Sequence, residues 1–324
     1  MTRALPSRRP GPQATNLALP ANVAAYAARS RAEATRKAYA SDWRLWAAYA
    51  AATGASTLPA SVEALCAYCV HMADVELLRV STIRRRLASI AVAHVAAAYD
   101  PPPTRDPRVR AVVTGIARTF GERPHRKDPA LLADLERAVA VCGRDLRGTR
   151  DRAVLLVGWA GAFRRAELAA LRYEDLVAEP GGIRIRLEVS KTDQTRRGMD
   201  KGIPHSSRDD LCAACALVAW LEMSRVDEGF VFRRLVGPQE RIGELPISGH
   251  MVARIVKRTL RSAGIVGDFA GHSLRRGLVT QAAMAGADTL TIMRQTGHRR
   301  VEQLAEYVAS ADVFTRNAAT EAGL

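Results

Sequence analysis

The feature of the sequence that most restricts the fold is a single change in hydrophobic period. Up to residue 175, apolar residues recur every three to four positions, which is the spacing of amphipathic helices. Between Ile183 and Val189, apolar and charged residues alternate instead, as in a half-buried strand. Lys201 to His205 is a candidate partner strand, and helical spacing returns at Asp210. The pattern predicts a mainly α chain that contains a small antiparallel β-hairpin or sheet.

Two segments with little to bury divide the chain. Residues 1–18 are rich in Pro, Arg and Gly, so we expect a disordered basic tail there. Residues 121–128 are charged and contain a proline, so few contacts should cross them and they form the predicted linker. The sequence therefore predicts an all-α domain at 19–120 and a mostly helical α+β domain at 129–324.

The charge balance indicates a polyanionic partner. The formal net charge is +15, and 43 of the 48 basic residues are arginine. Such an excess favours nucleic acid, because neutralised phosphates release condensed counterions. An arginine bias in base composition would give the same balance without any partner. Charge and a pI near 10.3 together favour DNA or RNA.

The cysteine content and the length of the apolar runs indicate in which cellular compartment we expect the protein. Five cysteines are too few and too irregularly spaced for a secreted disulfide framework. Two C-x-x-C pairs, Cys66/Cys69 and Cys212/Cys215, could form a zinc site, but their alanine- and leucine-rich surroundings favour small core residues. No apolar run reaches the roughly 18 residues of a membrane helix, and the N-terminus lacks a signal-peptide core. We expect a cytoplasmic, nucleoid-associated protein without metal or cofactor.

Basic residues on predicted helices are candidates for DNA contact. A helix capped by Ser81 carries consecutive arginines, predicted on the face opposite its apolar residues, and a helix beginning at Ser248 is also basic. Such side chains can enter a DNA major groove, although charge runs are more often solvated faces. The candidates are Arg36, Lys37, Arg84, Arg85, Arg86, His250, Arg254 and Lys257.

The last sixth of the chain combines residues suited to a phosphodiester. His272 and Arg275 are three positions apart and would share one helix face. Gly297 ends a further short helix directly before His298, and a third amphipathic segment carries Tyr307. A guanidinium neutralises non-bridging oxygens, imidazoles donate hydrogen bonds or move protons, and a phenol offers an oxygen nucleophile.

Earlier positions complete the set. Arg164 and Glu167 are three apart in GAFRRAEL, and Lys191 follows the predicted strand in SKTD. Each residue alone is more often structural, but their order and spacing, together with HSLR at His272 and the interval from His298 to Tyr307, form one series. That series resembles the tyrosine recombinase (phage integrase) family. The two-domain organisation is similar to its Cre-type members.

The resemblance implies a role for each phosphate-binding position. Arg164 and Arg275 would clamp the scissile phosphate, and Glu167 would orient the site. His272 and His298 would bind the phosphate and assist proton transfer. Positioned donors of this kind stabilise the extra negative charge of the transition state, so the reaction requires no metal.

The resemblance also implies the covalent steps. Tyr307 would attack the phosphorus and form a 3′-phosphotyrosyl link, and Lys191 would protonate the departing 5′-oxygen. Lys201 also flanks the hairpin and is an alternative acid, although the S-K-T context favours Lys191.

Further expectations follow from the family. Residues 19–120 would be a SAM-like core-binding domain of four to five helices, acting with the catalytic domain as a clamp on double-stranded DNA. A homotetramer would assemble on two short inverted-repeat sites and exchange a C-terminal helix near 312–322. Alternatives are a type IB topoisomerase and an inactive DNA-binding protein. Sequence leaves open the target site, the host element (phage, plasmid, transposon or chromosome), the need for accessory proteins, and whether integration, excision or dimer resolution results.

Overall fold

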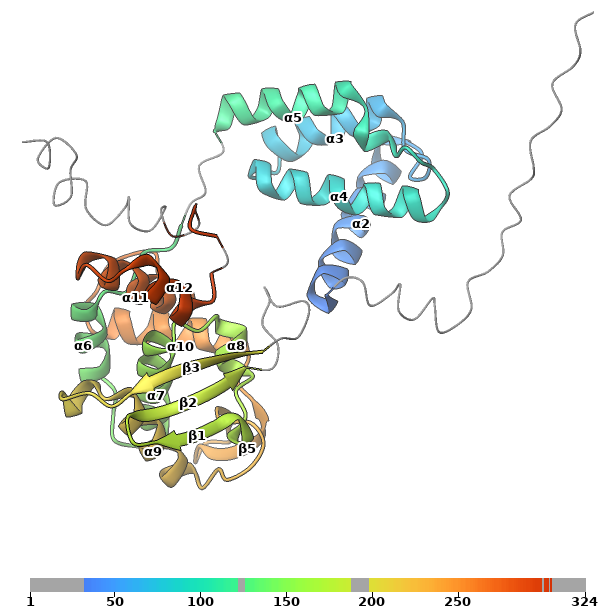
Figure 1. Cartoon of the computed structure of the whole chain (residues 1–324). Helices are drawn as coiled ribbons and strands as arrows, with labels where there is room; N and C mark the ends of the chain where they lie inside the picture. The colour runs from blue at the N-terminus through green and yellow to red at the C-terminus, as the bar shows by residue number, and fades with distance from the viewer. Residues whose placement is uncertain (1–31, 122–125, 188–197, 299, 303, 305–324) are drawn as a thin grey trace, which may run out of the picture. The chain divides into compact units, whose positions relative to one another are not determined.

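The structure is a computed structural model, and it describes residues 32–121, 126–187, 198–298, 300–302 and 304. The chain divides into two compact units, Met1–Pro124 and His125–Leu324 (Figure 1). The predicted tail at 1–18, Lys191, Tyr307 and the predicted C-terminal helix at 312–322 lie outside the described residues.

The N-terminal unit is built from helices around one apolar core, as its amphipathic pattern predicted. Trp46 and Tyr68 are fully buried in this core with Ile83 and Ile90. Ser61 caps one helix by accepting a hydrogen bond from the Ala64 N–H at 3.1 Å. The described elements are α2 (Glu33–Thr53), α3 (Val62–Asp74), α4 (Val80–Ala96), η1 (Pro103–Arg105) and α5 (Pro107–Phe120).

Helix α4 differs from its prediction in both its start and its faces. It begins at Val80, so Ser81 lies inside the helix and does not cap it. Arg84 and Arg85 are exposed, whereas Arg86 is only 7% exposed and donates to Glu76 and Tyr68. The prediction that Arg86 shares an exposed face is wrong, because each helical residue turns by about 100°. Arg86 therefore falls on the buried face.

The C-terminal unit contains most of its helices around α7, which is continuously buried from Ala153 to Gly158. Helix α9 packs along α7, and α10 and α11 also contact it (Figure 1). Ser248 caps α10 at its predicted start, and Asp288 caps α12, both through side-chain oxygens. The helices are α6 (Leu132–Ala140), α7 (Leu146–Ala160), α8 (Arg165–Ala169), α9 (Ala213–Ser224), α10 (Gly249–Ser262), α11 (Ser273–Met284) and α12 (Thr289–Thr296), with short turns η2 (Tyr173–Asp175) and η3 (Asp209–Leu211).

Two small antiparallel sheets complete this unit. Strands β1 (Leu176–Glu179), β2 (Gly182–Leu187) and β3 (Met199–Pro204) follow each other in order, with Ile185 opposite Lys201. The predicted hairpin is therefore present, with an additional strand before it. A second hairpin, which the sequence did not predict, is formed by β4 (Arg233–Val236) and β5 (Arg241–Pro246). Its alternation is short, and Gly237 with a positive φ of 72° supplies the turn.

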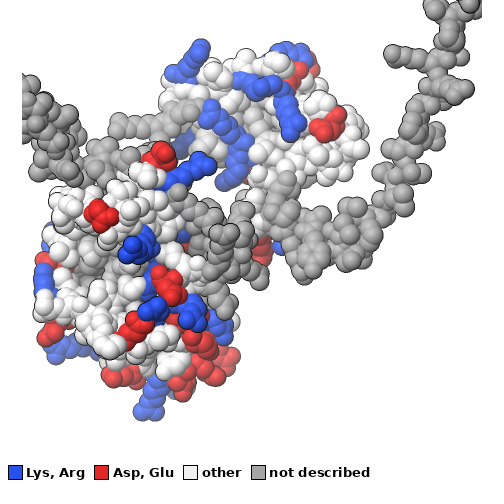
Figure 2. Space-filling view, in the orientation of Figure 1, with Lys and Arg blue, Asp and Glu red and all other residues white. Residues whose placement is uncertain are grey.

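Charged side chains are distributed differently over the two units. On the face drawn in Figure 2, basic side chains predominate on the N-terminal unit, whereas acidic and basic side chains intermix over the three-stranded sheet. There Arg184 pairs with Glu179 and Asp200 across neighbouring strands. Among the described residues, no helix is both long enough and apolar enough to cross a membrane.

Candidate active site

Arg164 is held at the start of α8 by the carboxylate three residues later. Glu167 accepts the Arg164 backbone N–H at 2.9 Å and its Nη1 at 2.6 Å. The same carboxylate therefore caps the helix and orients the guanidinium. The Glu167 side chain is 6% exposed and that of Arg164 is 20% exposed. The predicted pairing of these two residues is present, and it leaves Arg164 with an accessible edge.

Arg275 joins this site from α11, which lies far along the chain. Its side chain is buried, and Nη1 donates to the Ala162 carbonyl at 2.8 Å, in the turn that precedes Arg164. Helix α11 packs closely against the Ala130 backbone because Gly277 has no side chain. A Cβ at Gly277 would lie 1.7 Å from the Ala130 carbonyl oxygen. The backbone thus fixes Arg275 beside Arg164.

His298 is placed by the end of α12. Gly297 adopts a left-handed conformation with φ of 71°, which ends the helix and turns the next residue toward the site. The His298 Nε2 lies 3.0 Å from Arg275 Nη2, and its Nδ1 lies 2.8 Å from Thr296 Oγ1. A guanidinium can only donate, so Nε2 accepts and Nδ1 carries the proton. The Thr296 hydroxyl accepts a hydrogen bond from the Nδ1–H group and donates one to the Ile292 carbonyl.

His272 lies at the start of α11 and is the exposed member of the cluster. Burial of part of the ring, followed by the charges of Arg275, Arg276 and Arg164, lowers its pKa below the ordinary value. The side chain also keeps solvent access. This histidine can reach an incoming ligand while remaining neutral at pH 7.

Lys201 is buried beneath the site. The side chain is 1% exposed and Nζ donates to the Gly161 and Gln295 carbonyls, both at 2.5 Å. The Nζ also lies 5.0 Å from the centre of the Phe163 ring. It therefore ties the turn before Arg164 to the end of α12.

The electrostatics of the cluster are dominated by cations. Burial and then the charges of Arg275 and Arg164 lower the pKa of Lys201 to about 7, against the raising effect of Glu167. Burial, then Arg275 and Arg164, lower the pKa of His298 to about 4. The lowered pKa values of Lys201 and His298 show that additional positive charge is unfavourable in this cluster. A bound anion would therefore stabilise it.

The structure thus brings together five of the seven predicted catalytic or supporting residues: Arg164, Glu167, His272, Arg275 and His298. The sequence offered Lys201 only as an alternative acid and did not predict Gln295, whose Nε2 donates to the Ala160 and Gly202 carbonyls. A signal for Lys201 was present, since it lies two positions from both Met199 and Ile203 and so shares their face of β3. The position of Gln295 has no comparable sequence signal.

The predicted DNA contacts divide between exposed and engaged side chains. His250, Arg254 and Lys257 lie on α10 at helical spacing and are exposed. Arg36 and Lys37 are also exposed, with Lys37 paired to Glu33 at 2.6 Å. These positions stay predictions, and Arg86 is removed from them by its burial.

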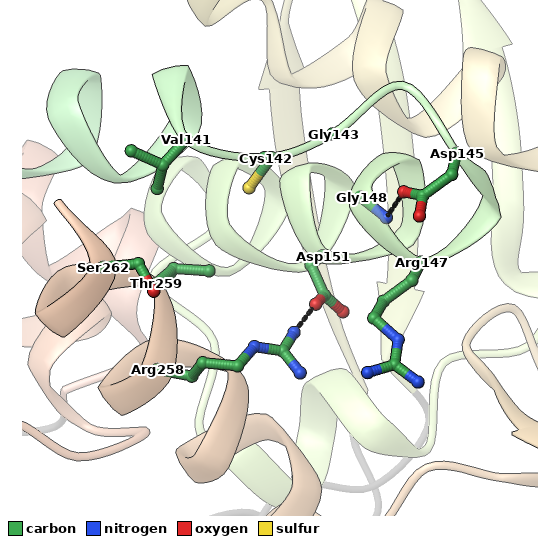
Figure 3. A pocket seen from close by; sticks show the side chains of 10 residues that line it. All are labelled: Val141, Cys142, Gly143, Asp145, Arg147, Gly148, Asp151, Arg258, Thr259 and Ser262. Carbon is green, nitrogen blue, oxygen red and sulfur yellow. Dashed lines mark hydrogen bonds and ion pairs between the residues drawn. The ribbon is translucent and has the colours of Figure 1, made fainter.

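A hollow of about 320 Å³ lies elsewhere, between the α6–α7 turn and α10 (Figure 3). Asp151 occupies its wall, where Arg258 and Arg150 both bond to its carboxylate. The Asp145 carboxylate in the same wall caps α7 by accepting the Gly148 N–H. Its lining contains none of the predicted catalytic residues, so it belongs to the packing of α7 against α10.

Comparisons with known proteins give a consistent result. Residues 132–313 match the model of the phage integrase family. The chain is 37% identical over 294 residues to an integrase/recombinase xerD homolog of Selenomonas ruminantium, covering 90% of this chain and 85% of that protein. It is 30% identical over 182 residues to the type 1 fimbriae regulatory protein FimE of Escherichia coli strain K12, covering 55% and 80% of the two chains.

Solved structures share the fold. The Tn1549 transposon integrase in complex with transposon right end DNA aligns with a TM-score of 0.62 at 15% identity, covering 93% of this chain and 97% of that one. A lambda integrase fragment, as a dimer bound to a COC′ core site, aligns with a TM-score of 0.60 at 16% identity, covering 91% and 94%. With the family model and the 37% identical relative, these observations show that the chain belongs to the phage integrase family, the tyrosine recombinases.

Proposed function

We propose that the clustered side chains of this site-specific DNA recombinase bind one backbone phosphate and exchange its ester bond. The observation that carries the proposal is the convergence of Arg164, His272, Arg275 and His298 from three separate helix ends. Their charges are opposed by Glu167, which is already hydrogen-bonded to Arg164. A phosphodiester supplies the missing negative charge.

Phosphate binding would rearrange contacts that are already prepared. The Arg275 guanidinium, which donates to His298 Nε2, would turn part of its fork to a non-bridging oxygen. An anion at this place opposes the surrounding cations and raises the pKa of His298. The imidazole then gains a proton at Nε2 and becomes a donor to the developing charge.

The covalent steps require two residues that lie outside the described part of the chain. Tyr307 would attack the phosphorus to form the 3′-phosphotyrosyl bond, and the 5′-oxygen would leave with a proton. We assign this proton to Lys191 and a positioning role to Lys201. The amine of Lys201 is buried and held by two carbonyls, whereas a general acid must reach the leaving oxygen.

The DNA partner and assembly are also part of the proposal. The similar solved structures are described as bound to a core site and to transposon-end DNA, which supports double-stranded DNA as the partner of this chain. We infer a Cre-like reaction between two short inverted-repeat sites by a homotetramer that exchanges C-terminal helices, in a mobile element and at the nucleoid. Plasmid relaxation without strand exchange would instead support topoisomerase activity.

The central test is Tyr307→Phe on a nicked suicide substrate that traps the covalent complex. The variant should bind the same duplex as the unchanged chain and form no adduct on a denaturing gel, because the nucleophilic oxygen is absent. Tyr99→Phe, an exposed tyrosine of the N-terminal unit, is the matched control and should form the adduct normally. An adduct with Tyr307→Phe would move the nucleophile to another residue.

The assignment of the acid is tested with Lys191→Ala and Lys201→Met. Both should slow cleavage of an ordinary phosphodiester. A 5′-bridging phosphorothiolate, whose sulfur leaves without a proton, should restore cleavage by Lys191→Ala but not by Lys201→Met, because the latter misplaces Arg164 and His298. The reverse pattern of rescue would make Lys201 the acid.

A further inference from the structure

A second group of reactive side chains lies outside the phosphate site, where β3 leads into α9. His205 directly follows the last residue of β3, and Cys212 and Cys215 lie at the start of α9. The possible ligand atoms of these three residues all lie within 4.8 Å of one another. Cys212 is buried, while His205 and Cys215 are exposed, so an ion could enter from solvent.

The geometry points to a metal site, and we propose that His205, Cys212 and Cys215 bind one zinc ion. The His205 Nδ1 lies 3.9 Å from each of the two sulfurs. Zinc with bonds of about 2.3 Å to sulfur and about 2.0 Å to nitrogen requires tetrahedral N–S separations of about 3.6 Å. The imidazole therefore needs only a small rotation to complete the set, and a water molecule fills the fourth position.

The backbone favours thiolate ligands at this place. Cys212 is the N-cap residue of α9, and its Sγ accepts the Cys215 N–H at 3.2 Å. A helix start and a donated N–H both stabilise a thiolate. Two thiolates and one imidazole form a soft set that prefers zinc to magnesium or calcium. A thiol or phosphine must first reduce the disulfide between Cys212 and Cys215 by supplying two electrons. The two thiols then lose their protons to solvent as they bind the ion.

The structure joins Cys212 and Cys215 in a disulfide, which is the alternative state of the same sulfurs. A disulfide by itself gives no reason for an imidazole at equal distance from both atoms, whereas a metal site does. Once the pair is reduced, the exposed Cys215 can turn away so that the sulfurs separate to about 3.8 Å, as two zinc ligands require.

The other C-x-x-C pair shows what a purely structural arrangement looks like. Cys69 is fully buried in the middle of α3, where burial raises the pKa of its thiol to about 12. Among the described residues, no histidine or carboxylate forms a comparable ligand group around that pair. From the sequence, both C-x-x-C pairs are interpreted as small core residues. We keep that interpretation for Cys66 and Cys69, and for Cys212 and Cys215 we propose zinc binding instead.

The proposed ion would fasten the end of β3 to α9. Four residues before His205, the same strand carries Lys201, which holds the turn before Arg164. The zinc ion therefore anchors a strand of the phosphate site without touching the phosphate.

The test uses the full chain, reduced with a phosphine and stripped with a chelator, and titrated with Co²⁺ as a spectroscopic probe. We expect one equivalent to give sulfur-to-cobalt charge transfer and tetrahedral bands, which Zn²⁺ then abolishes. Cys215→Ser and His205→Asn should each weaken or remove these bands, and Cys142→Ser, a half-buried cysteine outside the group, should leave them unchanged. Absence of the bands in the reduced chain, or full bands in Cys215→Ser, would overturn the site.

A second measurement keeps the anchoring role separate from ligand loss. Hydrogen exchange of the β3 amides should slow when Zn²⁺ is added to the reduced chain and should not respond in Cys215→Ser. Stoichiometric binding with unchanged exchange would contradict the anchor. Neither readout requires DNA or activity.

Discussion

Each unit contains a buried arginine, but the charge of Arg86 is paired with a carboxylate, whereas Arg275 lies among other cations. In the N-terminal unit, Arg86 donates to both carboxylate oxygens of Glu76 and to the Tyr68 hydroxyl. Burial alone would disfavour this cation, yet those hydrogen bonds raise the pKa of Arg86 above its ordinary value. In the C-terminal unit, Arg275 lies among other cations and lowers the pKa of Lys201 and His298.

The difference separates a structural cation, Arg86, from Arg275, for which we propose a function. A buried charge that is matched by a carboxylate holds helices together and requires nothing further. A cluster in which positive charges exceed carboxylates raises the energy of the free protein, and a bound anion relieves it. The excess at Arg164, Arg275 and Lys201 therefore supports this cluster as the proposed phosphate site, which composition alone could not locate.

The largest expected effect comes from removing the functional cation. Arg275→Ala should reduce the rate of covalent adduct formation by about 100- to 1000-fold, because a positioned donor to the transition-state charge is lost. The variant should unfold at nearly the same urea concentration as the unchanged chain, since lost hydrogen bonds are offset by relief of repulsion. Single-turnover cleavage of the suicide substrate measures the rate. Undiminished cleavage would remove Arg275 from the phosphate site.

Substitution of Arg86, the structural cation, should lower stability and leave catalysis unchanged. Arg86→Met should lower the free energy of unfolding of the N-terminal unit by about 2 kcal/mol, because the half-buried Glu76 carboxylate loses its partner. Adduct formation per folded molecule should stay unchanged. Urea titration followed by hydrogen exchange of the α4 amides measures the stability. A cleavage defect in folded Arg86→Met would indicate that Arg86 contributes to DNA binding or cleavage.

Local patterns in the sequence were sufficient for much of this organisation. The caps at Ser61, Ser248 and Asp288, and the pairing of Arg164 with Glu167, depend on residues within four positions of one another, so spacing alone predicts them. The burial of Arg86 depends on Glu76 and Tyr68, which come from other parts of the chain. Lys201 meets Gly161 and Gln295 across 40 and 94 positions, and no periodicity encodes such contacts. The β4–β5 hairpin was missed because its strands are short.

The smallest expected effect is a dependence of stability on pH. The folded pKa of His298 is about 4, below the ordinary value of 6.5, so the unfolded chain binds more protons between these values. The free energy of unfolding is therefore at its full value above pH 6.5 and falls as the pH drops toward 4. Solvent screening of the part-exposed imidazole keeps this fall below about 1 kcal/mol between pH 7 and 5.5. His298→Asn should reduce this slope in urea titrations at the two pH values, because asparagine does not titrate, and His272, whose pKa is also lowered, should account for part of the remainder. Arg275→Ala should flatten it in part, since removing the neighbouring cation lets the folded imidazole accept a proton more readily. A slope that both variants leave unchanged would mean that the cations around His298 are already neutralised, and the contrast between the two units would disappear.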